Sequence, residues 1–219
     1  MKRAMQRHAP SATEVLSQLA SLGVTGPVLH RMARSIGRNH DLAGELWESG
    51  SHGARLLACL VEEPERVTRA QMERWAREFD SWGLVDCACR YLFLYTPHAW
   101  KVCVAWSRRK PEFIKRAGFS QMAYLALHDK QADDARFEAL LERIEEEARD
   151  PRHFVTMAVN WALRQIGKRN LALNRKAIRA AKRIARQDSC AARWVAADAL
   201  RELNSPAVAR RLSAQRAIR

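Results

Sequence analysis

A tryptophan and an aspartate stand four residues apart at Trp82 and Asp86, directly after the candidate helix cap Ser81. If this stretch opens a helix, the two side chains share one face. The π face of an indole and a fixed carboxylate are both suited to stabilising a cation. The alternative is structural: Trp82 belongs to the core, and Asp86 is solvated or paired with an arginine.

A second candidate site is the basic last quarter of the chain. Residues 164–219 contain fifteen Lys and Arg against three acids, and 171–187 contain six bases and no acid. A solvated helix face normally mixes both signs, so a stripe of one sign predicts phosphate binding. Aromatic residues do not interleave the stripe, which favours the backbone of duplex DNA over single strands. The predicted DNA-binding residues are Arg164, Lys168, Arg175, Arg179, Lys182, Arg183 and Arg186.

The acidic segment from Asp129 to Asp150 is then expected to face away from bound DNA. Over the whole chain of 219 residues, 38 Lys and Arg outnumber 24 Asp and Glu, for a net charge of +14. That balance points to nucleic acid or an anionic membrane surface as partner. No run approaches the roughly 18 apolar residues that would span a bilayer, so no membrane segment is predicted.

The five cysteines are odd in number and lie in apolar contexts, which is typical of reduced thiols in a cytosol. Cys87 and Cys89 with His98 fit none of the usual zinc spacings, so no metal site and no cofactor are predicted. Residues 1–10 are basic but lack the apolar core of a secretory signal, and they form a candidate disordered tail.

The elements that must position these residues are helices. Apolar residues recur at helical spacing, and neither a strand pattern nor a hairpin turn is found. The stretch beginning at Phe113 resembles the one beginning at Phe154, 41 residues later, as in HEAT-type helix pairs. We therefore predict an all-α, HEAT-like helical-repeat solenoid: antiparallel pairs in one domain over 1–219, with a curved, concave, basic face. A compact helical bundle is the alternative. The expected helices are about 13–22, 27–36, 41–48, 52–62, 68–79, 81–96, 97–107, 111–128, 133–148, 151–167, 174–187, 189–203 and a tail after Pro206.

Several short motifs, in this order and spacing, resemble the AlkD-like DNA alkylation repair proteins, which are DNA glycosylases built from HEAT-like repeats. The resemblance covers nearly the whole chain. Its motifs are Leu46-Trp47-Glu48-Ser49-Gly50, Phe79-Asp80-Ser81-Trp82 with Asp86, Phe113-Ile114-Lys115-Arg116-Ala117, Ala158-Val159-Asn160-Trp161-Ala162-Leu163-Arg164 and Gln165-Ile166-Gly167-Lys168.

The resemblance implies hydrolytic excision of positively charged N3- and N7-alkylated purines from duplex DNA. It implies that Asp86 is catalytic, that Trp82 and Trp161 face the lesion, and that Arg116 grips a phosphate. Tyr124 departs from the pattern, because some members carry a lysine there. We further expect a monofunctional enzyme without cofactor, acting as a monomer in the cytoplasm and associated with the nucleoid when bound to DNA.

Structural interpretations stand beside these roles. Trp161 lies among apolar residues and is a candidate core residue, and Arg116 is placed to pair with Glu112 one turn earlier. A catalytically inactive HEAT-like DNA-binding or structural protein is the main alternative function, and a protein scaffold is a third. The remaining tryptophans are assigned to packing: Trp47, Trp75, Trp100, Trp106 and Trp194.

Overall fold

The computed structural model describes residues 10–217 and divides the chain into two compact units. The N-terminal unit is Met1–Thr68 and the C-terminal unit is Arg69–Arg219. Apart from Pro10, the predicted disordered tail lies outside the described residues, and a single domain over 1–219 stays a prediction. Within the described part, no helix has both the length and the apolar content to cross a bilayer.

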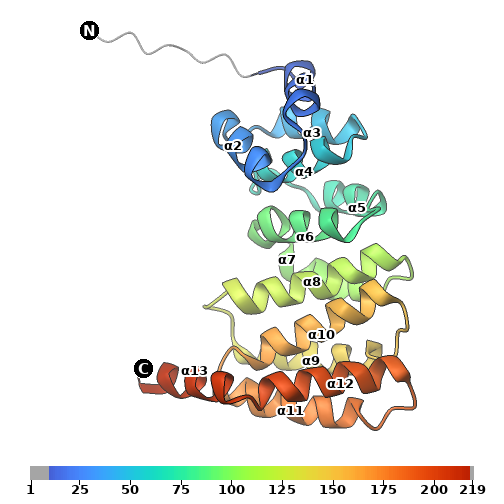
Figure 1. Ribbon diagram of the computed structural model, residues 1–219, viewed down its shortest axis with the longest axis vertical. Helices are drawn as coiled ribbons and strands as arrows, with labels where there is room; N and C mark the ends of the chain where they lie inside the picture. The colour runs from blue at the N-terminus through green and yellow to red at the C-terminus, as the bar shows by residue number, and fades with distance from the viewer. Residues whose placement is uncertain (1–9, 218–219) are drawn as a thin grey trace. The chain divides into compact units, whose positions relative to one another are not determined.

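The N-terminal unit consists of four short helices (Figure 1). A capping box starts the first, where the Ser11 hydroxyl accepts from the Glu14 amide while the Glu14 carboxylate accepts from the Ser11 amide. Leu46 and Trp47 are buried where the third and fourth helices pack. The helices are α1 (Ala12–Leu22), α2 (Gly26–Ile36), α3 (His40–Glu48) and α4 (His52–Val61).

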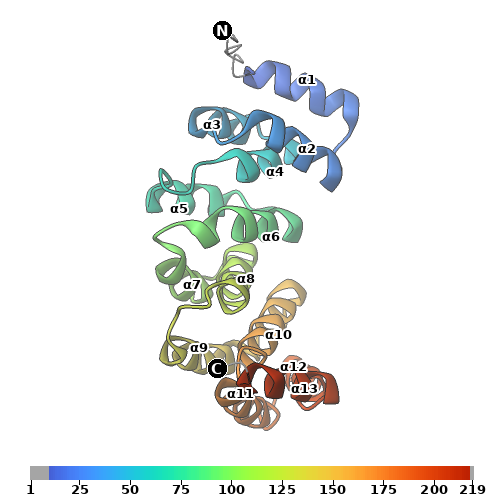
Figure 2. The ribbon, with the colours of Figure 1, turned by 90° about the vertical axis from the view of Figure 1, so that its left-hand side faces the viewer.

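The C-terminal unit stacks helices in two layers. Even-numbered helices from α6 to α12 form one layer and odd-numbered helices from α5 to α11 form the other (Figures 1 and 2). Antiparallel pairing buries one apolar face of each helix against both its partner and the next pair. The elements are α5 (Arg69–Arg77), α6 (Trp82–Tyr91), the short 3-10 helix η1 (Phe93–Tyr95), α7 (Ala99–Ser107), α8 (Glu112–His128), α9 (Asp134–Glu147), α10 (His153–Gly167), α11 (Leu171–Ile184), α12 (Cys190–Leu203) and α13 (Pro206–Ala217).

Helix α8 is the centre of this unit, packed against α6, α7 and α10. Gly118 permits the close approach of α7, since a Cβ there would lie 2.4 Å from the Ser107 backbone nitrogen. Phe113 and Phe154, the corresponding residues of the two matching segments, have ring centroids 5.4 Å apart. The internal repeat predicted from the sequence therefore corresponds to neighbouring helices of one layer.

Three helix boundaries differ from the sequence prediction by three residues or more, and one of them is the end of α11, at Ile184 rather than near Gln187. Helix α11 begins at Leu171 rather than near Asn174, because the Asn170 side chain accepts from the Leu173 amide and caps it. Helix α6 ends at Tyr91 rather than just before Pro97. Beyond it the chain turns into η1, which places Phe93 edge-on against a core tryptophan.

Candidate active site

Asp86 on α6 and Arg116 on α8 form a partly buried ion pair. Nη2 of Arg116 donates to both carboxylate oxygens of Asp86, at 3.0 and 2.9 Å, and Nη1 donates to the Phe154 carbonyl of α10 at 3.0 Å. Arg116 is only 7% exposed, whereas the Asp86 side chain keeps 23% exposure. Arg116 therefore binds Asp86 rather than Glu112, and it connects three helices of one layer.

Ser120 completes the support of the carboxylate. It lies one turn after Arg116 on α8, is fully buried, and its hydroxyl donates to Asp86 Oδ1 at 3.1 Å. Burial raises the pKa of Asp86 above its ordinary value near 3.8, and the opposing effects of Arg116 and Ser120 do not cancel it. Sequence reasoning missed Ser120, although its spacing of four residues from Arg116 was a usable signal.

Trp82 stands at the first position of α6, one turn before Asp86. Ser81 caps the helix as predicted, with its hydroxyl accepting from the Leu84 amide at 3.3 Å. Trp82 is 56% exposed, so it is not a core residue. The first turn of α6 thus presents a large aromatic surface beside a carboxylate that solvent can reach.

Trp161 is partly buried on α10, the third helix of this layer, and its indole is held on two sides. The Tyr124 ring of α8 meets it edge-on, with centroids 4.8 Å apart and planes at 90°. With the Gln165 amide oriented toward its donors, its oxygen accepts from Trp161 Nε1 at 2.9 Å and from Lys168 Nζ at 3.1 Å. The position of this indole is set by Tyr124, which the sequence marked only as a departure from the family pattern.

Tyr124, which contacts Trp161, also lies within the electrostatic field of the Asp86 carboxylate. It is nearly buried, and burial first and then the Asp86 charge raise the pKa of its hydroxyl. The same two causes raise the pKa of the buried Cys89 thiol well above its usual value, which keeps that thiol protonated. The charge of Asp86 thus acts on Cys89 of its own helix and on Tyr124 of α8.

A cluster of bases continues from Tyr124 toward the end of α8. The His128 ring stacks with that of Tyr124 at 6.3 Å, and burial together with Lys130 and Arg90 lowers the pKa of His128. Burial, Arg169 and Arg211 likewise lower the pKa of Lys130. Charges of one sign therefore lie close enough to oppose each other's protonation. We call these residues the end cluster: Arg90, His128, Lys130, Arg169 and Arg211.

The predicted DNA-binding bases occupy other places. Arg164 and Lys168 project from α10 and bind Glu202 of α12, at 2.5 and 2.6 Å. Burial alone would raise the pKa of Glu202, but these two partners outweigh it and lower that pKa. Both predicted bases thus form ion pairs between helices of the layer that carries Asp86.

The predicted stripe lies on α11, in the layer opposite Asp86 (Figure 2). All five of its bases are exposed, but Arg183 binds the Glu145 carboxylate of α9 through Nε and Nη2, at 2.8–3.0 Å. Lys176 beside the stripe pairs with Glu138. The acidic helix α9, which was expected to face away from bound DNA, packs against α11, because the two are neighbours in one layer. The stripe bases are Arg175, Arg179, Lys182, Arg183 and Arg186.

Among the described residues, no three His, Cys, Asp or Glu side chains gather as they would around a metal ion. Hydrogen bonds to the Asp86 side chain, within the same part of the chain, come from Arg116 and Ser120 alone. The arrangement offers a fixed negative charge beside the aromatic face of Trp82. Such an arrangement is suited to stabilising a cation and orienting a water molecule.

Comparison with known proteins adds a family and a fold. A family model described as DNA alkylation repair enzyme matches residues 1–203. One similar solved structure comes from "a new family of proteins related to the HEAT-like repeat DNA glycosylases with affinity for branched DNA structures". Its identity is 18% and its TM-score 0.69, over 86% of this chain and 94% of that one, which confirms the HEAT-like repeat fold. No curated protein matches the chain.

Proposed function

This chain belongs to the DNA alkylation repair enzyme family, and we propose that it is a monofunctional glycosylase that excises N3- and N7-alkylated purines from duplex DNA. The observation that carries the proposal is the state of Asp86. Its carboxylate is fixed by Arg116 and Ser120 yet remains open to solvent beside the exposed Trp82. A carboxylate held this way, with a raised pKa, is typical of functional sites.

The substrate explains why a charge and aromatic faces suffice. An N7-alkylated purine is already cationic, so its glycosidic bond breaks with the electron pair leaving on the base, which becomes neutral. Positive charge then develops at C1′ of the sugar. Each indole face, of Trp82 and Trp161, stabilises this charge by about 0.5–2 kcal/mol. Asp86 contributes the largest electrostatic effect and orients the water that adds to C1′.

Proton transfer in this scheme needs no acid on the base. The water gives its oxygen to C1′ and releases its proton to solvent by way of the Asp86 carboxylate, and the purine leaves neutral. The preactivated leaving group also makes a tight pocket around an extruded base unnecessary, unlike in most enzymes that act on bases.

Arg116 acts in this scheme chiefly as a positioning residue. It is nearly buried, and both terminal nitrogens are engaged, one with Asp86 and one with the Phe154 carbonyl. Its buried Nε has no hydrogen-bond partner among the described residues. The phosphate grip that the resemblance implies would require Arg116 to give up Asp86, so we assign it to holding that carboxylate oriented and ionised.

Duplex DNA is the proposed partner, bound by a monomer in the cytoplasm. Within the end cluster the exposed bases Arg90, Lys130 and Arg211 favour phosphate binding, because a polyanion relieves their mutual repulsion. Arg169 is 7% exposed and pairs with Asp134, so it is not available for such a contact. The end cluster begins beside Tyr124, which contacts the proposed lesion wall Trp161. Contacts from the α11 stripe and from Arg164 and Lys168 remain part of the proposal, although ion pairs already engage Arg164, Lys168 and Arg183.

Salt dependence separates the two basic regions. Each phosphate contact contributes about 0.9 to the slope of log affinity against log salt. We expect the double variant Arg90→Gln with Lys130→Gln to reduce the size of that slope by about 1.8, which corresponds to the loss of two phosphate contacts. Arg179→Gln with Arg186→Gln, matched in charge, should reduce it less. If the α11 double variant instead reduced the slope more, the principal DNA contact would be the stripe and not the end cluster.

The direct test of excision is release of 7-methylguanine from methylated duplex DNA. We expect wild-type protein to release the base and Asp86→Asn to be at least about a hundredfold slower, with DNA affinity changed by less than about twofold. Asp188→Asn is the matched control, because that aspartate is fully exposed. Wild-type protein that binds methylated DNA yet frees no base would refute the proposal.

A DNA-binding protein without turnover is the second candidate. The favouring observation is that Arg116 already binds both oxygens of Asp86 inside the protein. The similar solved structure, described as related to the glycosylases and as having affinity for branched DNA, fits the same alternative. The release assay decides between the two, because only the glycosylase depends on Asp86 for a product.

A further inference from the structure

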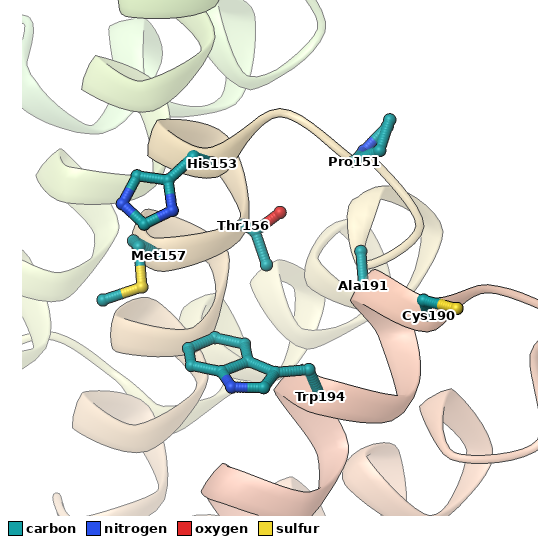
Figure 3. Close-up of a pocket in the computed structure, with 7 residues that line it drawn as sticks. All are labelled: Pro151, His153, Thr156, Met157, Cys190, Ala191 and Trp194. Carbon is teal, nitrogen blue, oxygen red and sulfur yellow. The ribbon is translucent and has the colours of Figure 1, made fainter.

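A groove lies at the beginnings of α10 and α12, and Asp86 is not among the residues that line it (Figure 3). Its volume is about 440 Å³, within the range of about 300–1,000 Å³ usual for ligand pockets. Helix α10 contributes one wall and α12 the other, and no acid is among the lining side chains. The lining of the groove includes His153, Met157, Cys190 and Trp194.

The groove exposes two large apolar side chains. Trp194 is 45% exposed and Met157 is 39% exposed, and the indole extends from α12 toward the Met157 side chain (Figure 3). The sequence assigned Trp194 to core packing, and that assignment is wrong, because residue 194 faces out of α12 while Val195 and Ala192 face in. An exposed indole and thioether in one groove indicate a binding surface rather than scattered apolar residues.

This groove is in register with the proposed active site. His153, Met157 and Trp161 follow at intervals of four residues along α10 and share one face. Four residues of helix span about 6 Å, which is close to two nucleotide steps of about 3.4 Å. The groove therefore lies within a distance of a few nucleotide steps from DNA that contacts Trp161.

Two arginines, each paired with an aspartate, stand at the rim of the groove. Arg193 lies over Cys190, with Nη2 donating to its Sγ at 3.2 Å, and the exposed Asp188 is 3.5 Å from Nη1 of Arg193. On the opposite side Arg152 is about one-third exposed and is bound to Asp150. Helices α10 and α12 both begin here, so the positive ends of both dipoles add to the same potential. An apolar floor beside two helix N-termini matches a nucleobase and its phosphate.

We propose that this groove binds an unpaired nucleobase of DNA, stacked on Trp194 and covered by Met157. Paired bases of a duplex stack on each other and offer no free face to an indole, whereas an unpaired base does. The inference rests on the DNA binding in the proposed function, but it does not require excision. The ligand class is a single-stranded DNA segment adjoining the bound duplex.

The test compares two DNAs that differ only in an unpaired extension. Fluorescence anisotropy gives Kd for a labelled blunt duplex and for the same duplex carrying a short single-stranded extension. Trp194→Ala should weaken binding of the extended DNA by about 5- to 150-fold and leave the blunt duplex within about twofold. Trp194→Phe should retain most of the affinity, because it keeps an aromatic face. Tyr95→Ala, which removes a comparably exposed ring (57%) elsewhere in the unit, is the matched control and should change neither Kd.

Failure of this inference and failure of the glycosylase proposal are distinguishable. An equal loss of affinity for both DNAs in Trp194→Ala would make Trp194 part of a general duplex-binding surface and would overturn the inference. An unchanged Kd for the extended DNA would also overturn it, and so would a wild-type protein that binds neither DNA. Selective loss with no excision by wild-type protein would support the inference and refute only the glycosylase. Normal excision by wild-type protein, with no change in Kd for the extended DNA in Trp194→Ala, would support the glycosylase and refute only this inference.

Discussion

Two aspartates of the C-terminal unit, Asp86 and Asp150, each bind an arginine, but their environments differ. Asp150, before α10, is 8% exposed and accepts from the Arg152 amide, Nε and Nη2, at 3.1, 2.9 and 2.5 Å, and from Lys115 Nζ at 3.2 Å. Asp86 retains 23% exposure and accepts from one nitrogen of Arg116 and from the Ser120 hydroxyl. One carboxylate is saturated with donors, and the other keeps room for a further partner.

The pKa values of the two groups move in opposite directions. Burial raises both, but at Asp150 the hydrogen bonds from Arg152 and Lys115 outweigh it and lower the pKa to about 2. At Asp86 burial prevails over Arg116 and Ser120, and the pKa is raised. The negative charge of Asp150 thus stabilises the fold, whereas that of Asp86 is retained at a cost to stability. Such a cost is expected where the charge serves chemistry.

The largest contrast is expected in stability. Asp150→Asn should lower the free energy of unfolding at pH 7 by about 2 kcal/mol, since a pKa lowered from 3.8 to about 2 corresponds to that much stabilisation of the ionised form. Asp86→Asn removes a charge that the fold carries at a cost but leaves the buried Arg116 without its counter-ion, so it should lower the free energy of unfolding by less than Asp150→Asn does. Urea denaturation of both variants measures the difference.

The pH dependence of the free energy of unfolding is the control for the comparison of Asp150 with Asp86. The contribution of Asp150 is complete above the unfolded pKa of about 3.9 and is lost as pH falls toward 2. The contribution of Asp86 has the opposite sign and declines as pH rises from the unfolded value through its raised folded pKa. Equal destabilisation by the two Asn variants at pH 7 would contradict the distinction.

Much of the fold was predictable because its signals are local. Caps such as Ser81, apolar spacing and the repeat of Phe113 at Phe154 depend on neighbours in the chain, and each corresponds to an observed helix or helix pair. The spacing of Trp82 and Asp86 was equally local. These features required no knowledge of which helices pack together.

The partners across helices were not predictable in this way. Arg116 lies 30 residues from Asp86, and only the packing of α6 against α8 brings the two together. Likewise, nothing in the all-basic stretch 171–187 shows that Glu145 of α9 binds Arg183. A pattern along one helix identifies charges, but the neighbouring helix decides whether they are neutralised.

A smaller effect is expected in the pH profile of excision. Asp86 acts as an ion, so kcat/KM should fall on the acid side as pH drops through its raised pKa. Arg116→Gln removes the charge that lowers this pKa and should move the acid limb upward by about 1–3 pH units. Ser120→Ala removes a single hydrogen bond and should move it in the same direction by about half a unit.

Arg116→Lys is the matched control, because it keeps the charge while losing the paired geometry, and it should shift the limb less than Arg116→Gln. The graded order distinguishes a role through Asp86 from a phosphate grip. If Arg116 instead held DNA, Arg116→Gln would raise KM and reduce the salt slope without moving the acid limb. If excision by Arg116→Gln is too slow to measure, the pH profile of Ser120→Ala alone tests whether the pKa of Asp86 sets the acid limb. An acid limb left in place by loss of the Ser120 hydroxyl would show that the pKa of Asp86 does not limit excision.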